Sequence, residues 1–333
     1  MFNSLNENKM IVESRQQGKS YSPFKLLLVY FVMMLVIDVV IQILFTPVSF
    51  YLLFSDREIL QLVMSNSADY SDVMSKVYEL LTNMPEWVNI LTLFFSAVML
   101  VVPIIYCKFI EKRTIGSMGF RKRRAVSEYV VGFVAGLIMM AIVAALCVFS
   151  NTVTYSGFSK SALTTAVLYL IGYMIQGMAE ETLIHGFFMV SSAKNTTLIY
   201  SLIMSSMLFS LSHGANSGIT LLGLLNIFLF GLFAGVYVLK RGNIWGIGAL
   251  HASWNFAQGS VLGFNVSGIS PGTSIFNFNT VDGMDRLNGG NFGPEGGLFV
   301  TLVLFAALGI LMIIKPNSHE VVEISSTADT DPM

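Results

Sequence analysis

The sequence predicts an all-α integral membrane protein, a polytopic bundle of about eight transmembrane helices with both termini in the cytoplasm. Three observations predict this fold. Hydrophobic residues make up 54% of the 333-residue chain and charged residues only 12%, whereas a soluble domain carries about 25% charged residues. The apolar residues gather into long stretches, and basic residues alternate with those stretches along the chain. The chain is therefore expected to fold in lipid.

Eight apolar stretches are the candidate spans. A helix needs about 20 apolar residues to cross about 30 Å of hydrocarbon. The stretches are 26–45, 88–106, 130–149, 163–190, 198–211, 219–239, 244–262 and 298–314. The fifth is short because it runs into Ser212, His213 and Gly214, and it reaches an adequate length if these polar residues continue the helix.

The charged loops predict the orientation. Cytoplasmic loops of membrane proteins carry an excess of Lys and Arg. Basic residues crowd the loop 108–124, and Lys240 with Arg241 follows the sixth stretch. Acidic residues such as Asp69 and Asp282 occupy the loops between. An even number of spans with both termini inside satisfies every loop.

One membrane domain accounts for nearly all of the chain. We expect a polar cytoplasmic segment at 1–25, a membrane domain at 26–315 with its functional core at 163–262, and a polar cytoplasmic tail at 316–333. The loop 263–297, between the last two stretches, is rich in Gly and Asn. A multi-pass protein of the cell membrane is expected, with membrane lipids as partners and no nucleic acid.

Two adjacent carboxylates stand inside the fourth stretch. Glu180 and Glu181 interrupt an otherwise apolar sequence, and a charge at mid-membrane costs about 2.5–3.5 kcal/mol on insertion scales. Glu181 and His185 are four residues apart and share a helix face, while Glu180 is turned away by about 100°. One carboxylate can therefore do chemistry while the other is held by a partner.

Histidines in the next spans complete a candidate site. His213 ends the fifth stretch, and His251 lies four residues before Asn255 on one face of the seventh. A buried carboxylate beside imidazoles is the arrangement expected for activating water. His251 and Asn255 would supply donors to the oxyanion of amide hydrolysis. Phe209 is expected to pack beneath His213.

The three segments together resemble the motifs of the CPBP intramembrane protease family, also called the Abi or CAAX protease family. Its pattern is E-E-x-x-x-R, then F-x-x-x-H, then H-x-x-x-N. The chain has Glu180-Glu181 followed by His185 in the last position of the first motif, then the second motif at 209–213 and the third at 251–255. The resemblance covers about 163–262.

The resemblance implies an intramembrane endopeptidase that cleaves a membrane-associated or lipidated peptide. Glu180 and His213 would activate the water, His251 and Asn255 would stabilise the oxyanion, and Glu181 would support the site. His185 stands where the family usually has Arg; a protonated imidazole would replace that charge, and a neutral one would not.

Other interpretations stay open at this stage. A catalytically silent immunity or scaffold protein of the same fold, or a proton-coupled transporter, could also carry such residues. No cofactor is favoured, although zinc could be held by Glu180, His213 and His251. The spacing weakens that case, because the helical i, i+4 pair joins His251 to Asn255, which is a poor zinc ligand. The pattern does not choose among prenylated CAAX ends, lipidated peptides, peptide precursors and transmembrane segments as substrates.

Overall fold

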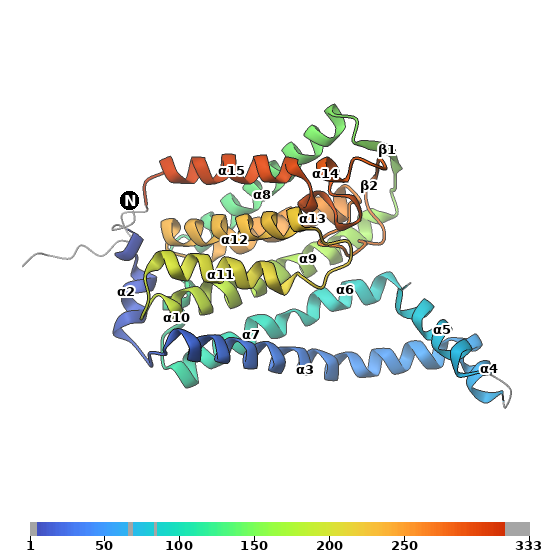
Figure 1. Ribbon diagram of the computed structural model, residues 1–333, viewed down its shortest axis with the longest axis horizontal. Helices are drawn as coiled ribbons and strands as arrows, with labels where there is room; N and C mark the ends of the chain where they lie inside the picture. Colours follow the sequence, from blue (N-terminus) through green and yellow to red (C-terminus); the bar gives the residue numbers. More distant parts are fainter. Residues whose placement is uncertain (1–4, 66–68, 83–84, 317–333) are drawn as a thin grey trace, which may run out of the picture.

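A computed structural model describes residues 5–65, 69–82 and 85–316, and Figure 1 shows long helices lying side by side with their connections gathered at two ends. The α-helices are α2 (Lys9–Gln16), α3 (Pro23–Ser55), α4 (Arg57–Met64), α5 (Tyr70–Thr82), α6 (Glu86–Phe95), α7 (Ala97–Ile105), α8 (Ala125–Phe149), α9 (Ala162–Glu181), α10 (Val190–Ser192), α11 (Leu198–Ser212), α12 (Leu221–Arg241), α13 (Trp245–Phe256), α14 (Asp285–Asn288) and α15 (Leu298–Ile313). Strands β1 (Val153–Phe158) and β2 (Phe276–Thr280) pair antiparallel at one end.

All eight predicted stretches are helical over most of their length. Five continuous helical runs are long and apolar enough to cross a membrane: Pro23–Ser55, Glu86–Glu111, Ala125–Phe149, Ala162–Ser192 and Leu221–Arg241. The runs Leu198–Ser212 and Leu298–Ile313 are shorter apolar helices, and α13 continues into a π-helical turn, Ala257–Val261. The predicted all-α polytopic bundle is confirmed. The number of crossings and the cytoplasmic position of the termini stay predictions.

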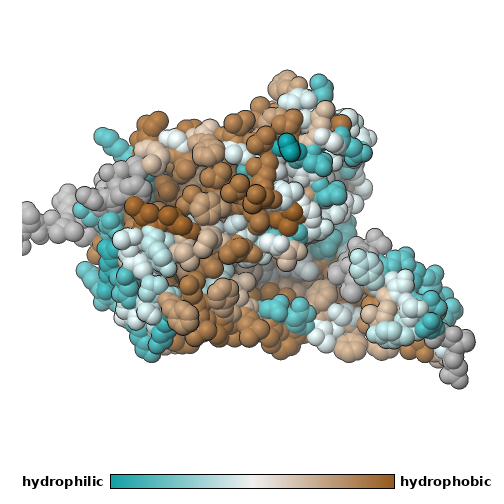
Figure 2. All heavy atoms as spheres, in the orientation of Figure 1, coloured by the Kyte–Doolittle hydropathy of each residue, from teal (hydrophilic) through white to brown (hydrophobic). Residues whose placement is uncertain are grey.

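The surface matches a membrane environment. Figure 2 shows hydrophobic residues over the sides of the bundle and hydrophilic residues toward its two ends. Leu35 on α3 and Leu302 on α15 are 62% and 60% exposed. Contiguous exposed apolar surface of this kind is rare on soluble monomers and marks contact with lipid or a partner. The prediction of a multi-pass membrane protein is therefore confirmed.

Helix α13 lies at the centre of the bundle, packed against α8 and α9. Small residues allow these close approaches. A β-carbon at Gly132 of α8 would lie 1.8 Å from the carbonyl oxygen of Gly246, and one at Gly177 of α9 would lie 2.7 Å from that of Gly248. These crossings bring the chemistry-bearing faces of α9 and α13 together.

The fourth helical run changes its geometry just after the paired glutamates. Residues Thr182–Met189 form a π-helix, a distortion that is frequent at functional sites. The fully buried guanidinium of Arg113 donates to the carbonyl oxygens of Gly186 at 3.0 Å and Phe187 at 3.2 Å. It also pairs with Glu111 at 3.2 Å. Arg113 therefore holds the π-helix from the connection after α7.

Both ends of the bundle are more structured than the sequence indicated. The polar segment 1–25 contains α2, whose Met10 and Ile11 are fully buried. The Gly- and Asn-rich loop contains β2, α14 and two 3₁₀ turns, Gly290–Phe292 and Pro294–Gly296. The tail at 317–333, including His319, lies outside the described residues.

Candidate active site

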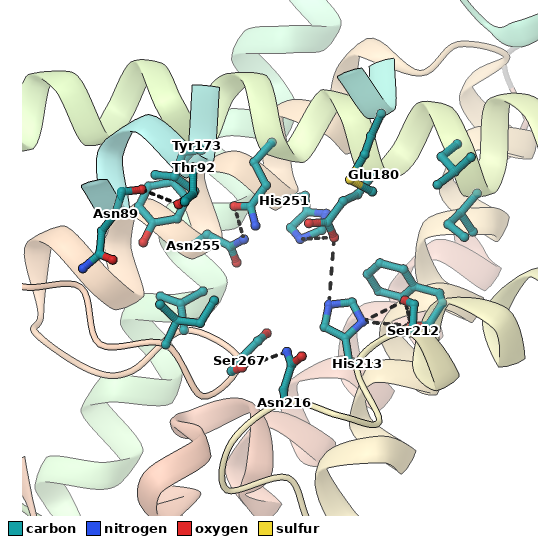
Figure 3. Close-up of a pocket in the computed structure, with 18 of the residues that line it drawn as sticks. Asn89, Thr92, Tyr173, Glu180, Ser212, His213, Asn216, His251, Asn255 and Ser267 are labelled. Atoms are coloured by element: carbon teal, nitrogen blue, oxygen red, sulfur yellow. Dashed lines mark hydrogen bonds and ion pairs between the residues drawn. The ribbon is translucent and has the colours of Figure 1, made fainter. Parts of the chain in front are cut away.

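The predicted site residues line one cavity. It has a volume of about 280 Å³ and lies among α3, α6, α9, α11, α13 and the loop after α13. Glu180, His213, His251 and Asn255 all face it, and Figure 3 shows their side chains converging from three different helical segments. The cavity therefore brings together four predicted site residues that lie up to 75 positions apart in the sequence, from Glu180 to Asn255.

Glu180 presents an unpaired carboxylate oxygen to this cavity. Its Oε2 atom is buried and has no hydrogen-bond partner among the described residues. It lies 4.0 Å from Nε2 of His213 and 3.9 Å from Nε2 of His251. These distances are too long for direct hydrogen bonds, which need about 2.7–3.2 Å. A water molecule can bridge groups at such a separation.

His213 is oriented by the helix that precedes it. It caps the C-terminus of α11, and its Nδ1 lies 2.9 Å from the carbonyl oxygen of Phe209. A carbonyl oxygen only accepts, so Nδ1 donates and, in the neutral ring, Nε2 keeps its lone pair. The ring of Phe209 packs edge-on against His213, with centroids 4.9 Å apart. Phe209 thus fixes the imidazole with Nε2 directed toward Glu180.

Glu181 is enclosed behind Glu180 and bridges two imidazoles. Its side chain is fully buried, its Oε1 accepts from Nδ1 of His251 at 3.0 Å, and its Oε2 accepts from Nδ1 of His185 at 2.6 Å. The other ring nitrogen of His185 faces the carbonyl oxygen of Gly231 at 3.0 Å. With Glu181 ionised, both nitrogens of His185 must donate, so the ring is an imidazolium.

Asn255 is held by a neighbour that the motifs do not include. Its Nδ2 donates to Oε1 of Gln176 at 3.3 Å. Gln176 lies one turn before Glu180 on α9, so a single helix positions both the carboxylate and the amide. The amide of Asn255 is 3% exposed and lines the cavity one turn after His251.

The family comparison covers this whole arrangement. Residues 162–257 match the family model described as Type II CAAX prenyl endopeptidase Rce1-like. The matched segment therefore resembles this family. The match contains all three motifs and confirms the predicted resemblance to the CAAX protease family. It supports an intramembrane protease of the CAAX type. No curated protein and no solved structure matches the chain.

The matched segment leaves out Glu295, which also approaches the site. Its Oε2 accepts from the backbone nitrogen of Ser267 at 2.7 Å and from its hydroxyl at 2.9 Å. Glu295, His213 and His251 line a smaller cavity of about 30 Å³ beside the main one. Burial raises the pKa of Glu295 above its usual value. An isolated acidic residue in a Gly-rich loop gave no signal in the sequence.

The spacing of the site residues differs from that of a zinc site. Glu180, His213 and His251 form a chemically suitable ligand set, but two ligands of a tetrahedral zinc lie only about 3.4 Å apart when each is about 2.0–2.1 Å from the metal. The separations of 3.9 and 4.0 Å are wider. Across the described residues, no group of three or more His, Cys, Asp or Glu side chains is close enough to hold a metal ion. The side chains as placed do not fit zinc.

Proposed function

We propose that the protein is an intramembrane endopeptidase in which Glu180 and His213 activate a water molecule to hydrolyse a peptide bond. The observation that carries the proposal is the buried Oε2 of Glu180, which has no hydrogen-bond partner and lies 4.0 Å from Nε2 of His213, a separation that one water molecule can bridge. A buried oxygen without a partner is uncommon because it forfeits a hydrogen bond. A bound water supplies that bond and is held ready to react.

The free lone pairs of Glu180 and His213 orient the water for hydrolysis. The water donates one hydrogen to Glu180 and one to His213, and its oxygen attacks the carbonyl carbon of the substrate. Glu180 takes the water proton as the new C–O bond forms and the carbonyl electrons move to oxygen. As the C–N bond breaks, Glu180 returns that proton to the leaving nitrogen, which departs as an amine.

His251 and Asn255 stabilise the negative oxygen of the intermediate. A ring whose Nδ1 donates to Glu181 can carry a second proton on Nε2, because the carboxylate compensates the positive charge. The imidazolium and the amide of Asn255 then present donors from one helix face. Donors fixed in a water-poor site are worth several kcal/mol to the transition state.

The buried pair of Glu181 and His185 serves as a support. It ties the π-helix of the first motif to α12 through the carbonyl of Gly231 and to α13 through His251. In this proposal the imidazolium of His185 replaces the arginine that the family usually has. Glu181 can then stay ionised and hold His251 in a single orientation.

A reconstitution experiment tests the proposed function. The purified full chain in proteoliposomes is incubated with membrane-tethered peptides, and the fragments are identified by mass spectrometry. We expect cleavage by the wild-type protein and none by Glu180→Ala, while Glu58→Gln, an exposed ion-pair residue far from the cavity, cleaves normally. A silent scaffold would give no cleavage in any variant. A proton-coupled transporter would move solute with the proton gradient and leave the peptides intact.

A further inference from the structure

The cavity has an open end that is built from loops. Ile269 and Ser270, from the loop after α13, are exposed at its rim, and Asn216 lies there after α11. Asn89, near the start of α6, lines the same end. These segments lie at the end of the bundle that carries β1 and β2 (Figure 1). Figure 2 shows the surface hollowed between α6 and these loops.

The opposite end of the cavity is closed by packed side chains. Leu183 and Ile184, one turn past Glu180, form its floor and are 1% and 3% exposed. Phe187 and Phe188 follow in the next turn and are 0% and 1% exposed. Their rings pack edge-on against those of Tyr106 and Tyr30, each pair with centroids 5.4 Å apart.

A charged layer lies beneath this floor. Arg113 and Glu111 are fully buried there, and Lys194 reaches Glu111 at 3.5 Å. A substrate approaching from this side would have to displace the aromatic side chains and this ion-paired layer. Breaking a buried ion pair costs several kcal/mol. The water and the scissile bond therefore reach Glu180 from the open end.

The distribution of charge indicates which end faces the cytoplasm. Exposed basic residues at 122–124, together with Lys240 and Arg241, lie at the closed end, where α8 begins and α12 finishes. Acidic residues, including Asp282 and Asp285, lie at the open end beside β2. Cytoplasmic segments near membrane spans are enriched in Lys and Arg. The closed end is therefore the cytoplasmic one, and the cavity opens on the opposite face.

The residues that line the cavity also indicate which kind of peptide bond can enter it. No lysine or arginine is among the described residues that line it, and its one carboxylate is that of Glu180. The imidazoles of His213 and His251 are already used in the proposed step, so a free C-terminal carboxylate would enter without a cation of its own to pair with, and burying an unpaired charge is costly. Asn89, Gln176 and Asn216 instead offer amide groups that can pair with the backbone of an extended chain.

We infer that the substrate is a membrane-anchored polypeptide whose internal scissile bond lies at the non-cytoplasmic face, rather than the C-terminal end of a cytoplasmic prenylated protein. The open rim, the closed floor and the sign of the charges at each end carry this inference. It rests on the proposed function, because it names the substrate class of the same site.

Cysteine labelling tests the direction of access without measuring proteolysis. Ser270→Cys at the rim and Gln176→Cys inside the cavity are exposed to a membrane-impermeant maleimide on intact cells. Arg123→Cys is the cytoplasmic control. The native Cys107 and Cys147 are free and fully buried, so the unmodified chain gives the background. We expect Ser270→Cys and Gln176→Cys to be labelled on intact cells and Arg123→Cys only after permeabilisation.

The reverse pattern would overturn the inference. Labelling of Arg123→Cys on intact cells, with Ser270→Cys protected until permeabilisation, would place the cavity mouth in the cytoplasm. Labelling of Ser270→Cys but not Gln176→Cys from outside would mean that the cavity is not reached from its open end. Ser270 is an exposed loop residue, so its variant is expected to fold.

A second arm tests the substrate class with the tethered peptide that the reconstituted protein cleaves. The peptide is fused to a single-span anchor on either its non-cytoplasmic or its cytoplasmic side, and both fusions are expressed with the wild-type chain or Glu180→Ala. We expect cleavage of the non-cytoplasmic fusion only. Cleavage of only the cytoplasmic fusion would reject the inference and leave the protease intact. If no tethered peptide is cleaved in proteoliposomes, the proposed function fails, whatever the labelling shows.

Discussion

Removing the imidazole of His185 should destabilise the protein strongly. The side chains of His185 and Glu181 are both fully buried and meet at 2.6 Å. In His185→Ala, the carboxylate oxygen at this contact loses its partner, and breaking a buried ion pair costs about 3–5 kcal/mol. The hydrogen bond to the carbonyl of Gly231 is also lost, for about 1 kcal/mol. We therefore expect His185→Ala to lower the free energy of unfolding by about 5 kcal/mol in total.

A double-mutant cycle isolates the pair. The free energy of unfolding is measured in detergent for His185→Ala, Glu181→Gln and the double variant. Because the penalty comes from an unpaired charge, Glu181→Gln should restore part of the stability lost in His185→Ala, with a coupling energy of about 0.5–3 kcal/mol. Cleavage should weaken in His185→Ala and persist in His185→Arg, whose guanidinium still faces Glu181.

Three results would refute this reasoning. Strictly additive free energies would mean that the two side chains do not interact as an ion pair. A loss below about 1 kcal/mol in His185→Ala would fall within the ordinary range of point substitutions. Abolished cleavage in His185→Arg with normal cleavage in His185→Ala would show that a positive charge at this position is not what the site needs.

Three further predictions concern metal, pH and helix packing. Cleavage should survive strong chelators, and the purified protein should contain substoichiometric zinc; chelation that stops cleavage and zinc that restores it would contradict the metal-free mechanism. Because burial raises the pKa of Glu295, its contribution to stability is present below the ordinary glutamate pKa of about 4.3 and is lost as the pH rises through the raised value. The melting temperature of the wild type should therefore fall with rising pH relative to Glu295→Gln, and parallel profiles would refute this. Gly132→Val should lower the melting temperature strongly because its β-carbon would meet the backbone of α13, whereas Gly309→Val, with nothing within 4 Å of the added carbon, should not; equal effects would contradict the packing argument.

The helices could be predicted because length and apolarity are local properties of the sequence. The stretch 26–45 lies within α3, which extends to Ser55 past an internal Pro47. The β1–β2 pair could not be predicted, because the strands are separated by more than 100 residues of helix and loop. The π-helix at Thr182–Met189 likewise depends on Arg113, which binds its carbonyls from a distant connection.

The sequence predicted the contacts of the site that lie within one helix, because they follow from helical spacing. The i, i+4 relation placed His185 beside Glu181, and the structure has them in contact. The bond between Glu181 and His251 spans 70 residues and exists only because α9 and α13 cross closely at Gly177. The contributions of Gln176 and Glu295 also depend on tertiary packing, so no spacing rule indicated them.

The most direct test of the central claim is the cleavage rate of Glu180→Gln, an isosteric change that removes the base and leaves the helix unaltered. The purified variant is compared with the wild type and with Glu58→Gln on one tethered peptide in proteoliposomes, and thermal unfolding confirms that all three are folded. General-base catalysis typically contributes about 10²–10⁴-fold to a rate, so we predict a loss of at least that size in Glu180→Gln alone. A folded Glu180→Gln protein that cleaves the peptide at the wild-type rate would contradict the account.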